Sequence, residues 1–278
     1  MEDSLTRFRI DGKVAVITGG AGFLGVKHAE AILDAGGIPI LADINEKTTR
    51  HQAADLAKKY NRDVLGVYAD ITTLPSVIEL CDNCIEQFGK VDILINNAAN
   101  DPKVKQEESG EPPWSRFEVF PEEIWNKDLS VGLTGAYLCS QIFGKEMAKR
   151  NRGVILNIAS DLGIIAPDQR IYKIEGLPDD RQPVKPVTYS VVKHGLIGLT
   201  KYLATYWADK GIRVNALCPG GVYNGQPADF VNKLTSLIPM GRMAKPDEYK
   251  PAIIFLVSDA SSYMTGASLI IDGGRTCW

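Results

Sequence analysis

The chain has 278 residues, of which 45% are hydrophobic and 23% are charged, and its formal net charge is -3. This apolar content is enough to bury a core, which excludes a disordered chain, and the slightly acidic balance argues against a nucleic-acid-binding protein. No apolar run approaches the roughly 18 residues that a membrane-spanning helix needs, and the acidic start does not resemble a signal peptide.

Strands and helices are predicted to alternate along the chain. In chain order we predict a strand at 13–18, a helix at 22–35, a strand at 38–42, a helix at 45–60, a strand at 64–68, a helix whose first turn holds Pro75, a strand at 91–95, a helix at 121–150, a strand at 154–158, a helix at 188–209, a strand at 212–217, a helix at 246–257 and a strand at 268–272. Most strands are continuous apolar runs, which is typical of strands covered by helices on both faces. The pattern predicts one α/β domain, residues 1–278, with a doubly wound, parallel, seven-stranded sheet.

Two stretches, residues 100–120 and 161–187, do not fit this alternation. Both are rich in proline, glycine and charged residues. Long irregular loops inside a compact domain are uncommon and are often functional. We therefore expect these two insertions to have a functional role.

A glycine-rich turn, Gly20-Ala-Gly22-Phe-Leu-Gly25, lies between the first predicted strand and the first predicted helix. In that position the glycines allow a pyrophosphate to approach the backbone, and the N-terminus of the helix offers free N–H groups to it. Asp43 ends the second strand, where a carboxylate can accept hydrogen bonds from ribose hydroxyls and repel a 2′-phosphate. The turn contains no lysine or arginine. The sequence thus predicts a Rossmann-like domain that binds NAD in preference to NADP.

A phenol and an ammonium stand four residues apart in Tyr189-Ser-Val-Val-Lys193, on one face of a predicted helix. A nearby positive charge favours the phenolate and lowers the tyrosine pKa, which suits proton exchange near neutral pH. Ser160 ends the fifth strand, at the edge where open α/β sheets place their ligands. Taken alone, the Tyr-x-x-x-Lys spacing is common by chance and is better explained as a pair on a helix surface; its combination with the other motifs favours a catalytic group of Ser160, Tyr189 and Lys193.

Taken together, these motifs resemble the short-chain dehydrogenase/reductase family over nearly the whole chain, and in particular its compact, single-domain branch. The chain is also similar to members from bacterial surface-glycan and flagellin-modification pathways. The residues that carry the resemblance are Thr18-Gly19 with the glycine turn, Asp70, Asn96-Asn97-Ala98-Ala99, Ser160, Tyr189, Lys193, Pro219-Gly220 and Asp272-Gly273-Gly274.

The resemblance implies a role for each residue. Tyr189 would be the general acid/base, Lys193 would hold the nicotinamide ribose and lower the pKa of Tyr189, and Ser160 would bind the reacting oxygen. The resemblance implies that the cofactor is bound by Gly19, Gly22, Phe23, Leu24, Gly25, Asp43, Asp70, Ile71, Asn97, Ala98, Tyr189, Lys193, Pro219, Gly220 and Val222. Asp70 would contact the adenine, and the Pro219-Gly220 loop would flank the nicotinamide.

Three positions depart from the family pattern. Phe23 stands where the compact branch has its middle glycine, and the spacing seen here is more typical of the extended branch of epimerases and dehydratases. Gly132 stands where many members have an asparagine that orders a water linking the lysine to solvent. Asn224 replaces a threonine after the Pro-Gly loop.

The leading hypothesis is an NAD-dependent oxidoreductase that transfers a hydride between nicotinamide and a secondary alcohol or ketone, on a sugar or sugar-phosphate-like substrate. One alternative is a sugar epimerase or dehydratase with tightly bound NAD. Another is a cofactor-binding regulator without turnover, a reading that Gly132 supports and that Ser160, Tyr189 and Lys193 oppose. Basic residues of the two insertions either bind an anionic or polyhydroxylated substrate or form a solvated surface: Lys103, Lys105, Arg116, Arg170, Lys173, Arg181 and Lys185.

The sequence also allows predictions about the oligomeric state, the partners and the cellular compartment. The family resemblance implies a homo-oligomer, a tetramer or a dimer, and the large apolar surface of Tyr202, Tyr206 and Trp207 suits such an interface. We expect no nucleic-acid, membrane or metal partner, and five cysteines without scaffold spacing favour the reducing cytoplasm. The pair Cys81 and Cys84 lies in a helical pattern and is interpreted as core packing rather than redox or metal chemistry.

Overall fold

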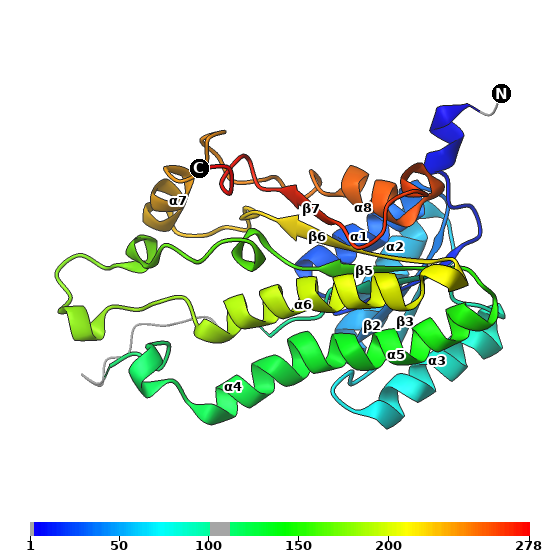
Figure 1. Cartoon of the computed structure of the whole chain (residues 1–278), viewed down its shortest axis with the longest axis horizontal. Helices are drawn as coiled ribbons and strands as arrows, with labels where there is room; N and C mark the ends of the chain where they lie inside the picture. The colour runs from blue at the N-terminus through cyan, green and yellow to red at the C-terminus, as the bar shows by residue number, and fades with distance from the viewer. Residues whose placement is uncertain (1–2, 101–111) are drawn as a thin grey trace.

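Seven parallel strands form one sheet in the order β3-β2-β1-β4-β5-β6-β7 (Figure 1). The computed structural model describes residues 3–100 and 112–278. Its strands are β1 (Val14–Thr18), β2 (Ile38–Asp43), β3 (Leu65–Tyr68), β4 (Ile93–Asn96), β5 (Gly153–Ile158), β6 (Ile212–Pro219) and β7 (Ser268–Ile271). Its α-helices are α1 (Phe23–Asp34), α2 (Glu46–Tyr60), α3 (Leu74–Phe88), α4 (Glu122–Leu129), α5 (Gly135–Lys149), α6 (Val187–Tyr206), α7 (Ala228–Thr235) and α8 (Lys250–Val257). The predicted fold, a single Rossmann-like α/β domain, is confirmed.

Helices cover both faces of the sheet, as the continuous apolar strands require. One face packs against α1, α2 and α8, and the core there includes Ile17 and Leu256. The other face packs against α3, α5 and α6, and the core there includes Val16 and Phe143. Val16 and Ile17 are neighbours in β1 and contribute to opposite layers, because successive side chains of a strand point to opposite faces.

The strand order reverses between β1 and β4. β1 pairs with β2 on one side and with β4 on the other, in parallel register from Ala15↔Ile93 to Ile17↔Ile95. The chain leaves β1 toward the α1 layer and leaves β4 toward the layer of α4 and α5. Open α/β sheets bind their ligands outside the carboxyl ends of the strands at such a point.

A buried polar ladder joins the two strands that follow the reversal. Asn96 in β4 donates to Asn157 in β5 (2.8 Å) and to Ser140 in α5 (3.0 Å), and Asn157 donates to Thr200 in α6 (2.8 Å). Asn157 and Thr200 are fully buried. Such groups stay stable in a core only when they are hydrogen-bonded to one another, so the ladder fixes the spacing of α5 and α6 over the sheet.

The helix predicted at 121–150 is present, but a π-helical turn, Ser130–Thr134, divides it into α4 and α5. Two glycines let this region lie close to its neighbours. A Cβ atom on Gly132 would lie 2.6 Å from Cγ1 of Val192, and one on Gly135 would lie 2.6 Å from Cδ1 of Ile71. π-turns of this kind often mark functional sites, and this one lies against α6.

Two predictions about helices were wrong in detail. The helix predicted from Pro246 begins at Lys250, because Glu248 accepts hydrogen bonds from the Lys245 backbone and from Arg242 and holds that segment in a turn. The helix α7 was not predicted; it follows Pro227, a residue suited to the start of a helix, and it buries Leu234.

The irregular segment 161–187 contains only short 3₁₀ turns, Asp161–Gly163, Gln169–Tyr172 and Asp179–Arg181. Figure 1 shows most of this segment at the same end of the molecule as α7. Of the other insertion, residues 112–120 are described and hold one 3₁₀ turn, Phe117–Val119. The described parts of the two insertions, residues 112–120 and 161–187, thus hold only short 3₁₀ turns before the start of α6.

Candidate active site

The glycine turn is built for close contact between backbones. Gly19 has a left-handed φ of +61°, and a Cβ atom on it would lie 2.8 Å from the Cα of Ala98. A Cβ atom on Gly25 would lie 2.2 Å from the carbonyl oxygen of Gly19, so α1 can meet the turn only through a glycine. At Gly22 the added atom would meet only the Gly19 oxygen, at 3.2 Å. Gly22 therefore faces open space, which is the cradle that a pyrophosphate needs.

The turn is tied to the end of β4. The hydroxyl of Thr18 accepts the N–H groups of Asn97 and Ala98, each at 3.1 Å. The side-chain amide of Asn97 donates to the carbonyls of Thr18 (3.0 Å) and Gly19 (3.1 Å). Asn97 and Ala98 thus hold the turn by hydrogen bonds from the end of the neighbouring strand.

Two carboxylates stand where the sequence placed them, after β2 and β3. Asp43 accepts a hydrogen bond from the N–H of Ala21 in the glycine turn (3.2 Å) and another from the N–H of Asn45 (3.1 Å). Asp70 accepts from the backbone and the hydroxyl of Thr72 (2.9 and 2.6 Å). Asp43 is therefore in direct contact with the turn, as a carboxylate for the ribose hydroxyls should be.

Three other residues of the predicted cofactor site differ in exposure. Phe23, at the start of α1, is exposed, and Leu24 is half-buried. The side chain of Ile71 is buried and packs at Gly135, so only its backbone is able to face a ligand. The branch-typical glycine is thus replaced by a phenylalanine that leaves the turn itself open.

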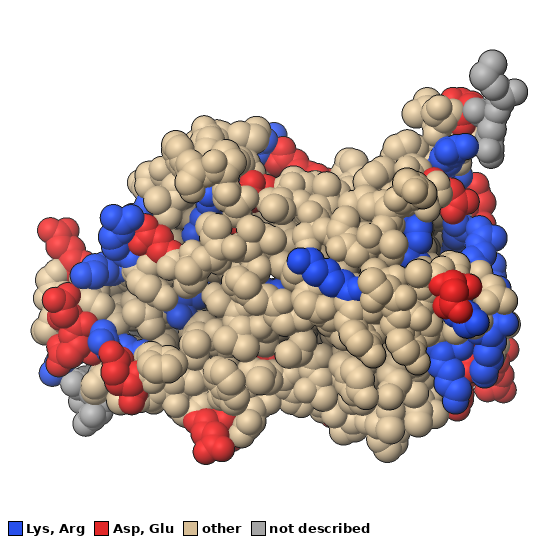
Figure 2. All heavy atoms as spheres, in the orientation of Figure 1, with Lys and Arg blue, Asp and Glu red and all other residues tan. Residues whose placement is uncertain are grey.

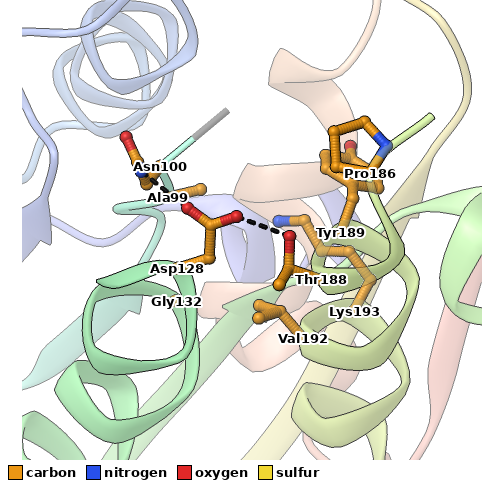
Figure 3. A pocket seen from close by; sticks show the side chains of 9 residues that line it. All are labelled: Ala99, Asn100, Asp128, Gly132, Pro186, Thr188, Tyr189, Val192 and Lys193. Atoms are coloured by element: carbon orange, nitrogen blue, oxygen red, sulfur yellow. Dashed lines mark hydrogen bonds between the residues drawn. The ribbon is translucent and has the colours of Figure 1, made fainter. Parts of the chain in front are cut away.

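Tyr189 and Lys193 line one small cavity on α6, together with Asp128 and Gly132 (Figure 3). Lys193 is buried, donates to the carbonyl of Ile158 at the end of β5 (2.8 Å), and has its Nζ 5.7 Å from the centroid of the Tyr189 ring. The predicted Tyr–Lys pair therefore lies beside the end of β5, where Ser160 follows.

Ser160 takes part in a chain of buried polar groups that the sequence reasoning missed. Its hydroxyl donates to Oδ1 of Asp161 (2.8 Å), whose Oδ2 lies 2.8 Å from Nη1 of Arg275. Asp161 and Arg275 are 2% and 7% exposed, so this ion pair is shielded from water. Arg275 follows the Asp-Gly-Gly segment, and no sequence signal linked it to Ser160, because 115 positions separate the two.

The loop after β6 is held from the carboxyl end of β7. Gly220 donates its N–H to the carbonyl of Ile271 (2.9 Å), and a Cβ atom on Gly220 would lie 2.8 Å from the Cα of Asp272. Tyr249 donates to the Gly220 carbonyl (3.3 Å), and burial raises the pKa of its phenol. Pro219 ends β6, and Val222 bridges to Ala244. The predicted nicotinamide loop is thus fixed by β7 rather than free.

The basic residues of the insertions fall into different settings. Arg170 forms an ion pair with Asp168 (2.6 Å), and Lys173 forms one with Asp179 (3.3 Å), both at the surface. Arg116 donates to the carbonyl of Asp179 (2.7 Å). Arg181 is exposed, and Lys103 and Lys105 lie outside the described residues.

Lys185 differs from these residues, because its Nζ lies 3.8 Å from the centroid of the Tyr189 ring. The structure thus brings one basic residue of the insertions to the predicted catalytic tyrosine.

The cysteines behave as packing residues. Cys81, Cys84, Cys139 and Cys218 are buried free thiols, and burial raises the pKa of Cys81 and Cys84 to about 12. A thiol with so high a pKa carries almost no thiolate at neutral pH, so redox chemistry at this pair is disfavoured. Among the described residues there is no cluster of His, Cys, Asp and Glu fit to hold a metal, and no helix long and apolar enough to cross a membrane.

The glycine turn at the strand reversal, with a tyrosine and a lysine at the same carboxyl edge, defines a dinucleotide-binding α/β protein of the dehydrogenase type. A family model described as short chain dehydrogenase matches residues 13–172, and one described as enoyl-(acyl carrier protein) reductase matches residues 181–276. The chain belongs to the short-chain dehydrogenase/reductase family, and it is an enzyme of the class that acts on CH–OH groups.

Relatives with stated activities are similar along their whole length. The D-threitol dehydrogenase of Mycolicibacterium smegmatis is 33% identical over 97% of this chain and 95% of its own. The NAD-dependent glycerol dehydrogenase of Listeria innocua is 34% identical over 97% and 96%. The structure of a gluconate 5-dehydrogenase from Burkholderia cenocepacia, in complex with NADP and tartrate, superposes with a TM-score of 0.85 at 27% identity over 99% of this chain and 100% of its own.

The buried ion pair yields the first prediction. We expect Arg275→Met to lower the free energy of unfolding by roughly 3–5 kcal/mol, because it leaves the Asp161 carboxylate buried without its partner. Urea unfolding followed by circular dichroism measures this. The matched control is Arg170→Met, which removes an arginine from an exposed ion pair and should leave stability nearly unchanged. If both substitutions lowered the free energy of unfolding by the same small amount, Arg275 would not form a buried ion pair with Asp161.

Proposed function

We propose that the protein is an NAD-dependent dehydrogenase that interconverts a secondary alcohol and its ketone on a polyol or sugar-like substrate. The observation that carries the proposal is the shared cavity of Tyr189 and Lys193, which lies beside the strand end that precedes Ser160. The activities stated for the threitol and glycerol dehydrogenases support the substrate class.

The chemistry assigned to the chain is proton transfer and orientation. When bound, the nicotinamide supplies the acceptor or donor of the hydride. In the oxidation direction the Tyr189 oxygen takes the proton of the substrate hydroxyl, and in reduction it returns that proton. The Lys193 ammonium beside the ring stabilises the phenolate that alternates with the phenol. The Ser160 hydroxyl, fixed by Asp161, orients the reacting oxygen.

The choice of NAD rests on the end of β2. The Asp43 carboxylate contacts the glycine turn through Ala21, where it is able to accept from ribose hydroxyls and repels a 2′-phosphate. The open space at Gly22 fits the pyrophosphate. Named relatives include an NAD-dependent dehydrogenase and a protein crystallised with NADP, so the preference of this chain rests on its own residues.

The substrate is proposed to carry an anionic group in addition to its hydroxyls. Lys185 places its ammonium over the Tyr189 ring, so a carboxylate or phosphate next to the reacting carbon would lie within reach of a positive charge.

We also propose that the enzyme is a dimer or tetramer that works in the reducing cytoplasm. Figure 2 shows that the face over α5 and α6 carries few charges in its middle, whereas charged side chains gather at both ends. Tyr202 and Tyr206 stack on each other there and are 63% and 61% exposed, while Trp207 packs on Gly144 in the chain's own core. Five free thiols suit a reducing compartment.

The function is tested by NADH formation with a panel of polyols, sugars and sugar acids. We expect turnover with NAD and at least a hundredfold loss of kcat in Tyr189→Phe, since general acid–base groups contribute on the order of 10²–10⁴-fold. Substrate conversion without net NADH would support the epimerase or dehydratase alternative. Cellular function that survives Tyr189→Phe would support a regulator instead.

Cofactor binding is tested with a pair of glycine substitutions. Gly22→Ala should leave the thermal unfolding midpoint nearly unchanged and weaken NAD binding by roughly tenfold or more, because the methyl group enters the space assigned to the pyrophosphate. Gly25→Ala should destabilise the fold itself, since its Cβ would overlap the Gly19 oxygen. Calorimetric titration gives the affinities. Unchanged NAD affinity in Gly22→Ala would place the pyrophosphate elsewhere.

The anionic substrate is tested with Lys185→Met, which keeps the aliphatic stem and removes the charge. We expect the KM for a sugar acid to rise about tenfold and the KM for the neutral polyol to change little, because a charge-assisted hydrogen bond is lost only with the acid. Lys173→Met is the matched control in the same insertion. Equal changes in KM for the sugar acid and the neutral polyol would mean that Lys185 acts only on Tyr189 and does not bind an anionic group of the substrate.

A further inference from the structure

Gly132 leaves the proton relay of this enzyme without the asparagine that many family members carry at this position. The structure also leaves little space for a side chain there. A Cβ atom on Gly132 would lie 2.6 Å from Cγ1 of Val192, and a β-branched side chain inside a helix has little freedom to turn away. A proton that leaves Tyr189 therefore needs another polar group in the cavity.

Asp128 lies one helical turn before Gly132 and supplies such a group. It is 4% exposed, and both of its carboxylate oxygens are held by neutral partners: Asn100 donates to Oδ1 (2.6 Å) and Thr188 donates to Oδ2 (2.5 Å). A buried carboxylate without a bonded cation is costly to keep and is a common feature of functional sites.

The cavity connects this carboxylate to the catalytic pair. Figure 3 shows Asp128 from α4 opposite Thr188, Tyr189 and Lys193 from α6, with the Lys193 ammonium close to the hydrogen bond between Asp128 and Thr188. The cavity offers about 10 Å³ for the centre of a water molecule, which is roughly the space that one water needs. Four of the lining residues, Asp128, Thr188, Tyr189 and Lys193, carry a polar side-chain group.

We propose that Asp128 is the proton-relay residue of this enzyme and takes the place of the missing asparagine. The inference rests on the proposed function. In oxidation the substrate proton reaches the Tyr189 oxygen, passes through one water in the cavity to a carboxylate oxygen of Asp128, and leaves from there to solvent. Within the relay only O–H bonds form and break, and the carboxylate is regenerated. The C–H bond of the carbinol breaks separately, and its two electrons leave with the hydride as the C=O bond forms.

A purely structural role for Asp128 makes a different prediction. In that case the carboxylate would only tie Asn100 to the start of α6, and its loss would reduce activity by the same factor at every pH. At high pH, hydroxide can take the proton directly and a relay is no longer needed. The loss of kcat in a relay variant must therefore become smaller as the pH rises. Among residues 3–100 and 112–278, the titratable groups that line the cavity with Asp128 are Lys193 and Tyr189, and Lys185 lies over the Tyr189 ring.

The test is the pH profile of kcat for Asp128→Asn, which retains the shape of the side chain. Its oxygen can accept from Asn100, and its NH2 group can donate to the Thr188 hydroxyl, which reverses the direction of that bond. We expect kcat to fall by about tenfold or more at pH 7 and to return to within about threefold of the wild type near pH 10, with the affinity for NAD unchanged. The matched control on the same helix is Glu123→Gln, an exposed carboxylate that should leave the profile unaltered.

A second variant gives a readout that does not need turnover. Asp128→Ala opens space for a small carboxylate, so formate should raise its thermal unfolding midpoint by about 2 °C or more and leave those of the wild type and Glu123→Gln unchanged. Formate should also restore part of its kcat.

The outcomes separate the two proposals. A defect of Asp128→Asn that is the same at every pH, or a kcat within twofold of the wild type throughout, overturns the relay and leaves the proposed function intact. A wild-type protein that shows no turnover on any substrate overturns both.

Discussion

The hydrogen bonds of Thr18 at the end of β1 are the constraint on which the rest of the site depends. Its hydroxyl accepts two N–H groups from the segment after β4, and the Asn97 amide returns two hydrogen bonds to the turn. These bonds fix the glycine turn against the neighbouring strand at the point where the strand order reverses. Gly22 is thereby held open, Asp43 reaches the turn, and the ends of β1 and β4 keep a constant separation.

The polar groups behind the catalytic residues extend this rigidity across the sheet. The ladder from Asn96 through Asn157 to Thr200 sets α6 over β5, and Lys193 closes on the end of β5 from the same helix. The buried Asp161–Arg275 pair holds the Ser160 hydroxyl from the chain's last residues. The proposed reacting groups are thus placed by hydrogen bonds from helices and strands, whereas the described basic residues of the two insertions are held mostly by contacts at the surface.

Most of the fold was predictable, because continuous apolar strands alternate with helices and the motifs follow the strand ends. The Tyr189–Lys193 pair was predictable from its helical spacing only in combination with the glycine turn, Ser160 and the other motifs in order along the chain, because this spacing by itself is common on helix surfaces. Arg275 and Asp128 were not, since their partners, Asp161 and Thr188, lie far from them in sequence and nothing local marks either pair. The π-turn escaped prediction because the pattern of residues 121–150 is helical throughout and only the contacts of Gly132 reveal the interruption.

The central claim is that this carboxyl edge of the sheet transfers a hydride from a carbinol carbon to a nicotinamide. The most direct measurement uses a polyol substrate deuterated at its carbinol carbons, with NAD, and mass spectrometry of both products. We expect one deuterium in each NADH formed, one equivalent of ketone, and loss of both in Tyr189→Phe. Conversion of the substrate with unlabelled cofactor and no ketone would contradict it.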